Sequence, residues 1–439
     1  MIHRPSIEIE YAMLAPKPFL FERAFNVGKA IREHRRLEEI LEEEGVRVRR
    51  LEDEIIEHAE NSTEFRRKLI EYILQNVHFY GKMDEVRSAM QDLQRNLEKL
   101  DSSTLFDYMV LEPSIDLKTD YENRAVYPTV YSNIPLANLY FMRDQQAVAD
   151  KGMIIGNMKR DQRKKETEIT EFFFKNAMGE TNIFKVPQSS HFEGGDFMPA
   201  DSFSLIGVGL RTDLNGAFSA MNSGMITSDE VVIVENPKYE FSKGDNMVNM
   251  HLDTYFNIAG DGIAVTSMYL ASRAKATIYG RASSGNYEKV GESTLLDYLK
   301  SKNFNIIDLS IPEQLAYSSN FLTVRDRRII SVEVKSVVKR LISDGAFDAV
   351  TENIVRQELS KMSDGIFPDR RDVSSAGIEY INADKRGKIK IFIPGKNKNK
   401  KDAKNIGSEC EVCRELNLVQ IKEKIKLKYM LFWFLSCHF

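Results

Sequence analysis

Four short stretches with chemically reactive side chains follow one another along this chain of 439 residues, and their spacing limits the folds that it can adopt. They read Phe-Met-Arg-Asp at 141–144, Glu-Gly-Gly-Asp at 193–196, Met-His-Leu-Asp at 250–253 and Cys-Glu-Val-Cys at 410–413. Together with Asn320 they recur every ~40–90 residues, without a literal sequence repeat. Such intervals favour α/β modules that each end one strand at a common central site, as in propeller-like folds.

Short apolar runs between turn residues dominate the second part of the chain and predict the strands of a mixed α/β fold. The predicted strands cover 108–111, 152–156, 203–209, 231–234, 263–265, 304–309, 321–324, 329–332 and 389–393. Predicted helices cover 295–300 and 346–363. Near the start of the chain, 22–44 has helical composition, with Gly45 at its C-terminal end and a strand beginning at Val46.

Residues 51–105 have a different character, because they are charged, nearly free of glycine and show helical spacing of apolar side chains. We expect a helical insertion there, and we expect the flanking parts, 1–50 and 106–420, to form one catalytic α/β propeller. The last residues, 421–439, run from a Lys-rich segment into an apolar, aromatic one that is too short to span a bilayer. An element packed on the core, a membrane-surface anchor and an unselected extension of the gene all stay open for this tail.

Composition excludes several classes of protein. The net charge is −4, with acidic and basic residues mixed, so the strongly basic field of a nucleic-acid-binding protein is missing. No apolar run reaches the ~18–20 residues of a membrane helix, and the first residues lack the apolar core of a signal peptide. The three cysteines, Cys410, Cys413 and Cys437, are not spread along the chain as in a disulfide framework. A reducing, cytoplasmic location is therefore expected.

His251 and Asp253 are two residues apart, so on an extended strand their side chains would point to the same face. An imidazole beside a carboxylate can move protons in catalysis, but a core histidine that hydrogen-bonds its neighbour has the same sequence. Metals also bind His-X-Asp pairs, yet the other histidines form no ligand-like spacing with His251. We therefore expect no metal at this site.

The other three stretches are equally ambiguous when each is taken alone. Asp144 follows an apolar run, where a buried carboxylate needs a partner, and a salt bridge to the adjacent Arg143 would provide one. Glu193 precedes two glycines, which fit a tight turn. Cys410 and Cys413 could form a redox pair or half of a zinc site, but no second cysteine pair exists, and the functional interpretation is a lone nucleophile.

Taken together, the four stretches resemble the arginine deiminases of the guanidino-group modifying superfamily, in which the same motifs occur in this order. Further similarities are the basic run before Glu-Thr at 163–167, the Leu-Arg-Thr at 210–212 and the Asn-Phe-Leu at 320–322. The chain departs from the family pattern before Cys410, where an arginine and several glycines give way to Asn-Ile-Gly-Ser-Glu at 405–409. The Cys-X-X-Cys form is closer to that of the amidinotransferases.

The resemblance implies a five-fold α/β propeller of ββαβ modules that hydrolyses L-arginine to L-citrulline and ammonia, with no metal or organic cofactor. Asp144 and Asp253 would clamp the planar guanidinium group of the substrate. The Cys410 thiolate would attack the guanidinium carbon and form a covalent intermediate. His251 would transfer protons, and Glu193 would orient His251.

The same resemblance implies substrate binding by three more residues. Arg211 and Arg163 are candidates for binding the substrate carboxylate, and Asn320 is a further substrate-binding candidate. The expected partner is a small guanidino compound such as L-arginine, with no nucleic acid and no membrane, and a homo-oligomer is left open. Two alternative functions also stay open. They are amidino transfer to an amine, favoured by the 410–413 motif, and arginine binding without turnover, suggested by the unusual region 396–439.

Overall fold

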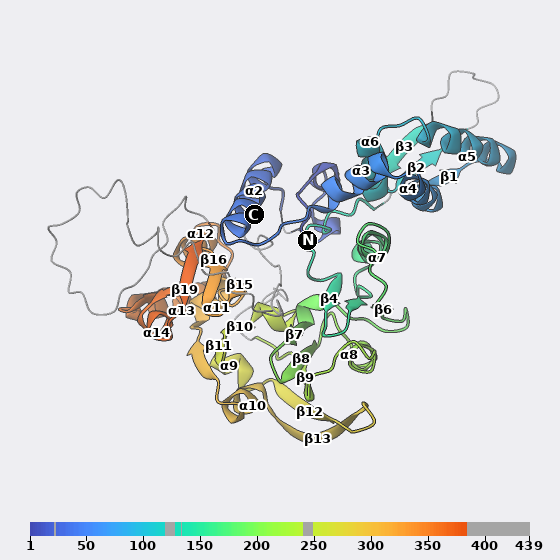
Figure 1. Cartoon of the computed structure of the whole chain (residues 1–439). Helices are drawn as coiled ribbons and strands as arrows, with labels where there is room; N and C mark the ends of the chain where they lie inside the picture. The colour runs from blue at the N-terminus through green and yellow to red at the C-terminus, as the bar shows by residue number, and fades with distance from the viewer. Residues whose placement is uncertain (22, 119–127, 133, 240–248, 384–439) are drawn as a thin grey trace, which may run out of the picture.

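A mixed α/β fold is seen in the computed structural model of the chain, in which small sheets and helices alternate along the sequence (Figure 1). The residues that the structure describes are 1–21, 23–118, 128–132, 134–239 and 249–383. The prediction of an α/β fold is confirmed. The predictions for Cys410, Cys413, the strand 389–393 and the tail 421–439 lie outside the described residues.

Four sheets in the described part of the chain belong to successive structural modules. The first module contains β4 (Gln146–Val148), β5 (Met153–Ile155), α7 (Glu166–Asn176) and β6 (Ile183–Lys185). The second contains β7 (Phe197–Pro199), β8 (Phe203–Val208), α8 (Leu214–Met221) and β9 (Glu230–Glu235). The third contains β10 (Phe256–Gly260), β11 (Ile263–Thr266), α9 (Met268–Ala271), α10 (Leu295–Ser301) and β14 (Asn305–Asp308). The fourth contains β15 (Leu322–Arg325), β16 (Arg328–Ser331), α12 (Val334–Ser343), α13 (Ala349–Lys361) and β19 (Glu379–Asn382).

All four modules share one pattern of strand pairing. Two antiparallel strands form a hairpin, and a third strand returns through at least one helix to pair parallel with the second strand of that hairpin. Figure 1 shows the modules in chain order, from β4 through β8 and β11 to β16. The described residues therefore contain four ββαβ modules in a row, although no sequence repeat marks them.

The second sheet is larger than the other three. Two further strands, β12 (Lys275–Arg281) and β13 (Tyr287–Thr294), leave the third module and extend the sheet beyond β9. β12 pairs antiparallel with β9, and β13 is the outer strand. Shorter elements complete the connections of the fourth module, namely α11 (Ile311–Leu315), β17 (Gly365–Ile366), β18 (Asp369–Arg370) and α14 (Arg371–Ser375).

Burial of apolar side chains explains why these segments form strands. Every residue of β5, β7 and β11 is buried, which suits apolar runs in sheets that are covered on both faces. The predicted strands at 203–209, 231–234 and 263–265 are confirmed, as is the hairpin of β15 and β16. One apolar core joins the second, third and fourth modules through side chains such as Leu205, Ala264 and Ile329.

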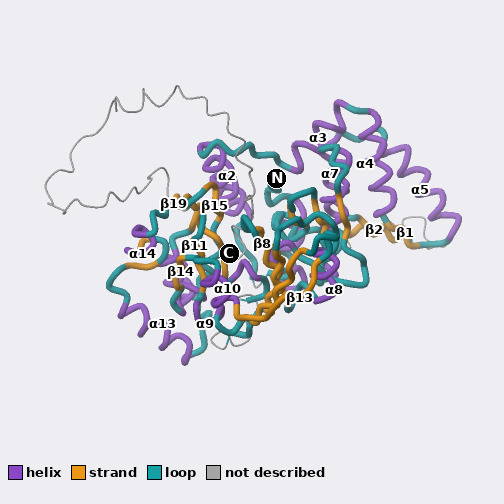
Figure 2. Tube along the Cα trace, turned by 60° about the horizontal axis from the view of Figure 1, so that its bottom comes forward, coloured by secondary structure: helices purple, strands orange, loops and turns teal. Residues whose placement is uncertain are grey.

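Helices between the N-terminal segment and the first module form an arm that extends away from the sheets in Figures 1 and 2. They are α3 (Leu51–Asn61), α4 (Thr63–Asn76), α5 (Met83–Leu97) and α6 (Ser102–Leu111). A small sheet of β1 (His78–Tyr80), β2 (Pro113–Asp116) and β3 (Thr129–Ser132) accompanies them. The apolar core of the arm is shared with α7 of the first module, because Leu69 and Phe106 of the arm cluster with Phe173 of α7.

The strand predicted at 108–111 is wrong, because these residues form the last turn of α6. Asp101 caps this helix by accepting a hydrogen bond from the backbone nitrogen of Thr104 at 2.9 Å. Leu105 and Met109 then lie on the buried face of the helix. An apolar run of four residues has no periodicity that could distinguish a buried helix end from a strand.

The first segment of the chain contains α1 (Ile7–Ala12), the 3₁₀ turn η1 (Lys17–Phe19) and α2 (Val27–Glu43). The predicted helix is confirmed as α2 but begins later than residue 22, because Asn26 caps it by accepting a hydrogen bond from the backbone nitrogen of Lys29. The strand predicted from Val46 is reduced to a single parallel bridge between Ile2 and Arg50.

The helix α2 packs on the sheet of the fourth module, far from it in sequence. Leu37 and Leu41 share an apolar cluster with Ile330 of β16. Beside this cluster, the Arg328 guanidinium donates two hydrogen bonds of 2.6 Å to the carboxylate of Glu44. No helix in the described ranges is both long and apolar enough to cross a membrane.

Candidate active site

The Glu-Gly-Gly-Asp motif forms a tight 3₁₀ turn, η3 (Gly194–Asp196), as predicted. A Cβ atom on Gly194 would lie 2.2 Å from the backbone oxygen of Arg143, so no side chain fits there. A Cβ atom on Gly195 would lie 2.8 Å from His251 Nδ1 and 3.0 Å from Asp144 Oδ1. The two glycines therefore let three of the motifs meet in a space that any larger residue would fill.

His251 and Asp253 do not lie on an extended strand, so that prediction is wrong. His251 is the N-cap of another 3₁₀ turn, η4 (Leu252–Thr254), and Asp253 lies within that turn. Asp196 holds this turn from the second module, because its Oδ1 accepts a hydrogen bond from the backbone nitrogen of Leu252 at 2.9 Å. A non-local hydrogen bond thus supports a turn here, and the two-residue periodicity of a strand does not apply to His251 and Asp253.

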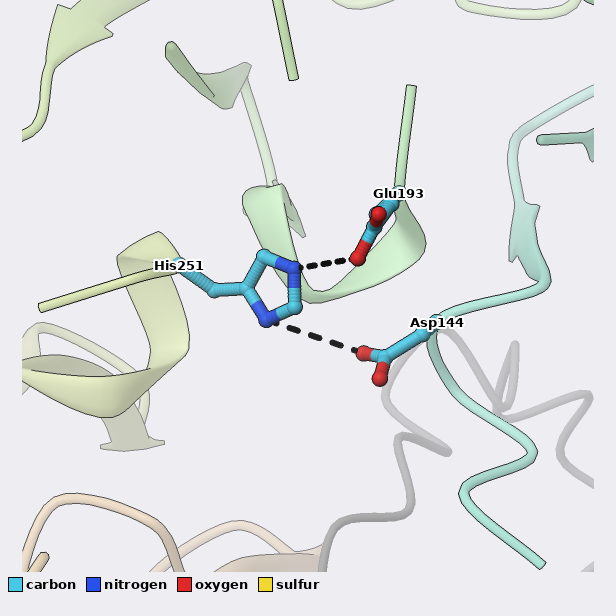
Figure 3. Close-up of side chains that lie close together, drawn as sticks. All are labelled: Asp144, Glu193 and His251. Atoms are coloured by element: carbon cyan, nitrogen blue, oxygen red, sulfur yellow. Dashed lines mark hydrogen bonds and ion pairs between the residues drawn. The ribbon is translucent and has the colours of Figure 1, made fainter. Parts of the chain in front are cut away.

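The imidazole of His251 lies between two buried carboxylates from other motifs, those of Glu193 and Asp144 (Figure 3). His251 Nε2 lies 2.9 Å from Glu193 Oε2, which is hydrogen-bond distance. On the other side of the ring, Nδ1 lies 3.8 Å from Asp144 Oδ1 and makes no hydrogen bond with a described residue. Nδ1 is therefore the ring nitrogen that remains available to a ligand.

Neighbouring carboxylates decide the charge of this imidazole. Burial lowers the pKa of His251, but the negative charges of Asp144, Glu193 and Asp196 outweigh it and raise the pKa to about 9. Burial acts on Glu193 in the opposite sense, yet its hydrogen bond to His251 holds the pKa of this carboxyl well below its usual range. At neutral pH the pair is an imidazolium beside a carboxylate.

A metal ion could in principle use the same residues, because ligand atoms of Asp144, Glu193 and His251 all lie within 4.8 Å of one another. Histidine binds metals as the neutral imidazole, however. The raised pKa of His251 favours the imidazolium at neutral pH. A metal ion bound at His251 would therefore have to displace this proton.

Asp253 is a buried carboxylate with unused hydrogen-bonding capacity. Its Oδ2 forms an ion pair with Arg143 Nε at 2.7 Å, while Oδ1 has no hydrogen-bond partner among the described residues. Burial raises the pKa of Asp253 to about 7, against the opposing effect of the Arg143 charge. Asn320 donates a hydrogen bond to the backbone oxygen of Asp253 at 3.3 Å and so steadies its turn.

Two further arginines approach the site. Arg163 Nη1 donates a hydrogen bond of 2.6 Å to Asp144 Oδ2. Arg211 is also buried, and its Nη1 lies 3.8 Å from Glu193 Oε1. The partner that was expected for Asp144, its neighbour Arg143, instead forms its own ion pair with Asp253.

The structure thus gathers every predicted site residue that it describes. These residues are Asp144, Glu193, His251, Asp253, Arg163, Arg211 and Asn320. Cys410 lies outside the described residues. Arg143 and Asp196 contact the site without having been predicted to do so. Both belong to the recognised motifs, which was the only signal available for them.

Several known proteins are similar to this chain. The family model described as arginine deiminase matches residues 17–367. The arginine deiminase of Halobacterium salinarum is 29% identical over 263 residues, which cover 45% of this chain and 54% of that protein. The arginine deiminase of Metamycoplasma arthritidis is 27% identical over 265 residues, covering 59% of this chain and 62% of that protein. The chain therefore spans about half to two thirds of the length of these relatives.

A longer match at lower identity also occurs. The arginine deiminase of Borrelia garinii is 23% identical over 386 residues, covering 82% of this chain and 91% of that protein. Among solved structures, DDAH from Pseudomonas aeruginosa in complex with citrulline has a TM-score of 0.33 and 17% identity, covering 50% of this chain and 73% of that chain. Since the family model matches most of the chain, the protein belongs to the arginine deiminase family.

Proposed function

We propose that this protein hydrolyses L-arginine to L-citrulline and ammonia through a covalent Cys-amidino (thiouronium) intermediate on Cys410. Family membership supports the proposal, as do the names of the relatives. The observation that carries it is a set of buried polar atoms without hydrogen-bond partners among the described residues. Asp253 Oδ1, His251 Nδ1 and Arg211 Nη1 all belong to this set. Buried polar atoms are normally satisfied, so their gathering here indicates a ligand.

The unsatisfied atoms match the chemistry of arginine. A carboxylate such as Asp253 pairs with a guanidinium through charge-assisted hydrogen bonds, and Asp144 supplies a second carboxylate. Arg211 and Arg163 supply positive charge near the site for the carboxylate end of the substrate. Asn320 supports the clamp through the backbone of Asp253.

In the first half of the reaction, the Cys410 thiolate attacks the central guanidinium carbon and a C–S bond forms. The C–N bond to a terminal nitrogen breaks, and that nitrogen leaves as ammonia. His251 supplies the proton for the leaving group, because its raised pKa keeps it protonated at neutral pH. Since Nε2 is engaged with Glu193, the proton comes from Nδ1.

In the second half, a water molecule attacks the carbon of the thiouronium intermediate. His251, now neutral, accepts one proton from this water, the C–S bond breaks to restore the Cys410 thiolate, and the second proton of the water is lost to solvent as the urea carbonyl forms. The product carries a urea group in place of the guanidinium. Glu193 stays ionised throughout and stabilises the imidazolium that forms again.

We extend the proposal to the fold and the domain boundaries of the chain. Four described ββαβ modules, together with the parallel bridge between Ile2 and Arg50, support a five-fold propeller in which the first segment belongs to the fifth module. We assign 1–50 and 106–420 to this catalytic propeller, 51–105 to a helical insertion, and 421–439 to a C-terminal tail. The protein acts in the cytoplasm on a small guanidino compound, and its oligomeric state is a matter for solution measurements.

One experiment tests the function. The wild-type protein is incubated with L-arginine, and citrulline and ammonia are assayed together. We expect equal amounts of both products, and on the order of 10³-fold or greater loss in Cys410→Ser, because a hydroxyl is a far weaker nucleophile than a thiolate. Cys413→Ser is the matched control and should keep most of the activity. Loss of activity in Cys413→Ser alone would move the nucleophile to that position.

The 410–413 motif favours amidino transfer as the second candidate function. Adding glycine to the same assay separates the two reactions. Hydrolysis predicts unchanged citrulline and no amidinated glycine. Formation of amidinated glycine at the expense of citrulline would assign the protein to transfer.

A further inference from the structure

Asp196 is a fully buried carboxylate that the proposed reaction does not use. Its Oδ1 accepts two hydrogen bonds of 2.9 Å, one from the backbone nitrogen of Leu252 and one from Asn236 Nδ2. Leu252 lies between His251 and Asp253, which are the proton carrier and one carboxylate of the guanidinium clamp in that reaction. One oxygen of Asp196 therefore holds the backbone between two functional side chains, and Asn236 shares that oxygen.

Asn236 follows directly after β9, and the pairing of β8 with β9 determines its position. Its backbone nitrogen donates a hydrogen bond to the backbone oxygen of Val208 at 2.8 Å. Its side-chain Oδ1 accepts a hydrogen bond of 3.0 Å from the hydroxyl group of Tyr255. The reverse orientation of the amide would place two acceptor oxygens 2.9 Å apart at Asp196. The hydroxyl group of Tyr255 thus turns the amide so that its NH₂ group faces Asp196.

These hydrogen bonds hold both ends of the turn η4. At its start, Leu252 is connected to Asn236 through Asp196. At its end, the fully buried Tyr255 is the residue that follows the turn, and it contacts Asn236 directly. Hydrogen-bond geometry inside a 3₁₀ turn is poor, so bonds from outside contribute strongly to its position.

Two glycines in and after β8 leave room for this arrangement. A Cβ atom on Gly207 would lie 2.3 Å from Asp196 Oδ1 and 3.0 Å from Asn236 Oδ1. A Cβ atom on Gly209 would lie 3.2 Å from the Cβ atom of Asn236. Glycine inside a strand weakens it and often marks the close approach of another group. Here the approaching groups are the side chains of Asp196 and Asn236.

An amide holds Asp196 without cancelling its charge. Burial raises the pKa of Asp196, whereas the charge of His251 and the hydrogen bonds from Asn236 and Leu252 lower it. The charge of Asp196 is in turn one of those that raise the pKa of His251. A neutral donor therefore suits this position better than a lysine or an arginine, which would pair with the carboxylate.

We propose that Asn236, oriented by Tyr255, is a positioning residue for the reaction. It acts through Asp196 to hold η4, so that His251 and Asp253 keep their places beside the substrate. The inference rests on the proposed function, because it assigns a role to residues behind that same site.

The test measures kcat and KM for citrulline formation in the full-length protein, at temperatures well below the melting temperature of each variant. Asn236→Ala removes the donor to Asp196, and we expect kcat/KM to fall on the order of 10²-fold. Tyr255→Phe removes only the hydroxyl group that orients the amide, and we expect a fall on the order of 10-fold. It also keeps the aromatic ring in the core, so it decides the question if Asn236→Ala does not fold.

Tyr298→Phe is the matched control. This buried tyrosine of α10 also donates one hydrogen bond, to Glu230 Oε2 at 2.6 Å, at the opposite end of β9. Both tyrosine variants should lower the melting temperature, because each loses one such bond. In Tyr298→Phe, however, kcat/KM should stay within about twofold of wild type, because this residue does not contact η3 or η4.

The pH profile separates loss of position from loss of charge. Asp144, Glu193 and Asp196 are the carboxylates whose charges raise the pKa of His251. Tyr255→Phe removes none of these charges, so the alkaline limb of kcat/KM should stay within about half a unit of wild type. A displaced alkaline limb would overturn the inference, and so would equal kcat/KM in Tyr255→Phe and Tyr298→Phe.

A wild-type protein that forms no citrulline would refute the proposed function separately. The two tyrosine variants are then compared by isothermal titration with L-arginine. Tyr255→Phe alone should weaken binding, on the order of 10-fold, because Asp253 lies on the turn that it holds. Equal affinities in the two variants, or no binding by the wild type, would overturn the inference as well.

Discussion

Two buried clusters in this chain contain the same kinds of side chain but behave differently. Near the N-terminus, His34 Nδ1 lies 3.0 Å from Glu38 Oε1, and in the candidate active site, His251 Nε2 lies 2.9 Å from Glu193 Oε2. Both histidines are buried. Burial lowers the pKa of His34, and its single carboxylate partner does not reverse that effect. The pKa of His251 is raised to about 9, although burial opposes this, because Asp144 adds its charge to that of Glu193.

The two clusters also differ in how completely arginines and carboxylates are paired. In the N-terminal cluster, Arg4 Nε donates to Glu38 at 2.6 Å and Arg50 Nε donates to it at 2.9 Å, so the carboxylate is saturated by cations. In the active-site cluster, Asp253 and Arg211 each keep an atom without a hydrogen-bond partner among the described residues. Burial of charge is therefore common to structural and functional clusters. Unused hydrogen-bonding capacity at Asp253 and Arg211 distinguishes the proposed site from the saturated carboxylate of Glu38.

The largest expected effect comes from replacing each histidine in turn. His251→Ala should reduce kcat for citrulline formation by about 10²–10⁴-fold, because the proton for the leaving ammonia is lost. His34→Ala is the matched control, and its activity per folded molecule should stay within about threefold of wild type, since only one buried hydrogen bond is removed. Equal losses in the two variants would break the distinction between the clusters.

The N-terminal cluster should respond in stability. Glu38→Gln removes the charge that pairs with Arg4 and Arg50, and we expect the free energy of unfolding at pH 7 to fall by about 1.5–3 kcal/mol in urea denaturation. Its partners hold the pKa of Glu38 below its ordinary value of 4.5, although burial opposes them. The stabilisation is therefore present above pH 4.5 and is lost as the pH falls below it. A difference between variant and wild type that persists unchanged at pH 3 would contradict this assignment.

The pH dependence of activity sharpens the contrast further. Asp253 must be ionised to hold the guanidinium, so kcat/KM should rise as the pH passes about 7, where its pKa lies. His251 must be protonated to act as an acid, so kcat/KM should fall as the pH passes about 9. In Glu193→Gln the alkaline limb should move at least about one unit towards lower pH, because a charge that raises the pKa of His251 is gone. An unmoved alkaline limb would mean that another group controls it.

The smallest effects are expected from two glycines, one in each region. Gly195→Ala would press a Cβ atom against His251 Nδ1, and we expect kcat/KM to fall on the order of 10-fold. Gly45→Ala meets no atom within 4 Å but must adopt a φ of +78° at the end of α2. It should lower the free energy of unfolding by about 1 kcal/mol in urea denaturation without changing kcat/KM. A loss of kcat/KM in Gly45→Ala, with kcat/KM unchanged in Gly195→Ala, would contradict this assignment of the two glycines.

Local features of the fold and the site could be predicted from the sequence, whereas partners that come from other modules could not. The Glu-Gly-Gly-Asp stretch predicts its own tight turn, but the close approach of Arg143 and His251 that requires glycine there comes from other segments. Arg143 and Asp253 form an ion pair across modules, and nothing near either residue specifies the other. The expectation of a strand at His251 failed for the same reason, since the backbone nitrogen of Leu252 donates a hydrogen bond to Asp196, which belongs to another segment. Such contacts depend on how the modules pack, and the periodicity of a short segment carries no information about them.

The contact between α2 and the fourth module has a consequence for synthesis of the chain. Glu44 and Arg328 are 284 residues apart, so α2 leaves the ribosome long before its partner sheet exists. At typical translation rates the delay is roughly 15–60 s. During that time the apolar face formed by Leu37, Ile40 and Leu41 has no sheet to cover it, and the nascent chain offers chaperones a binding surface that the finished protein no longer displays.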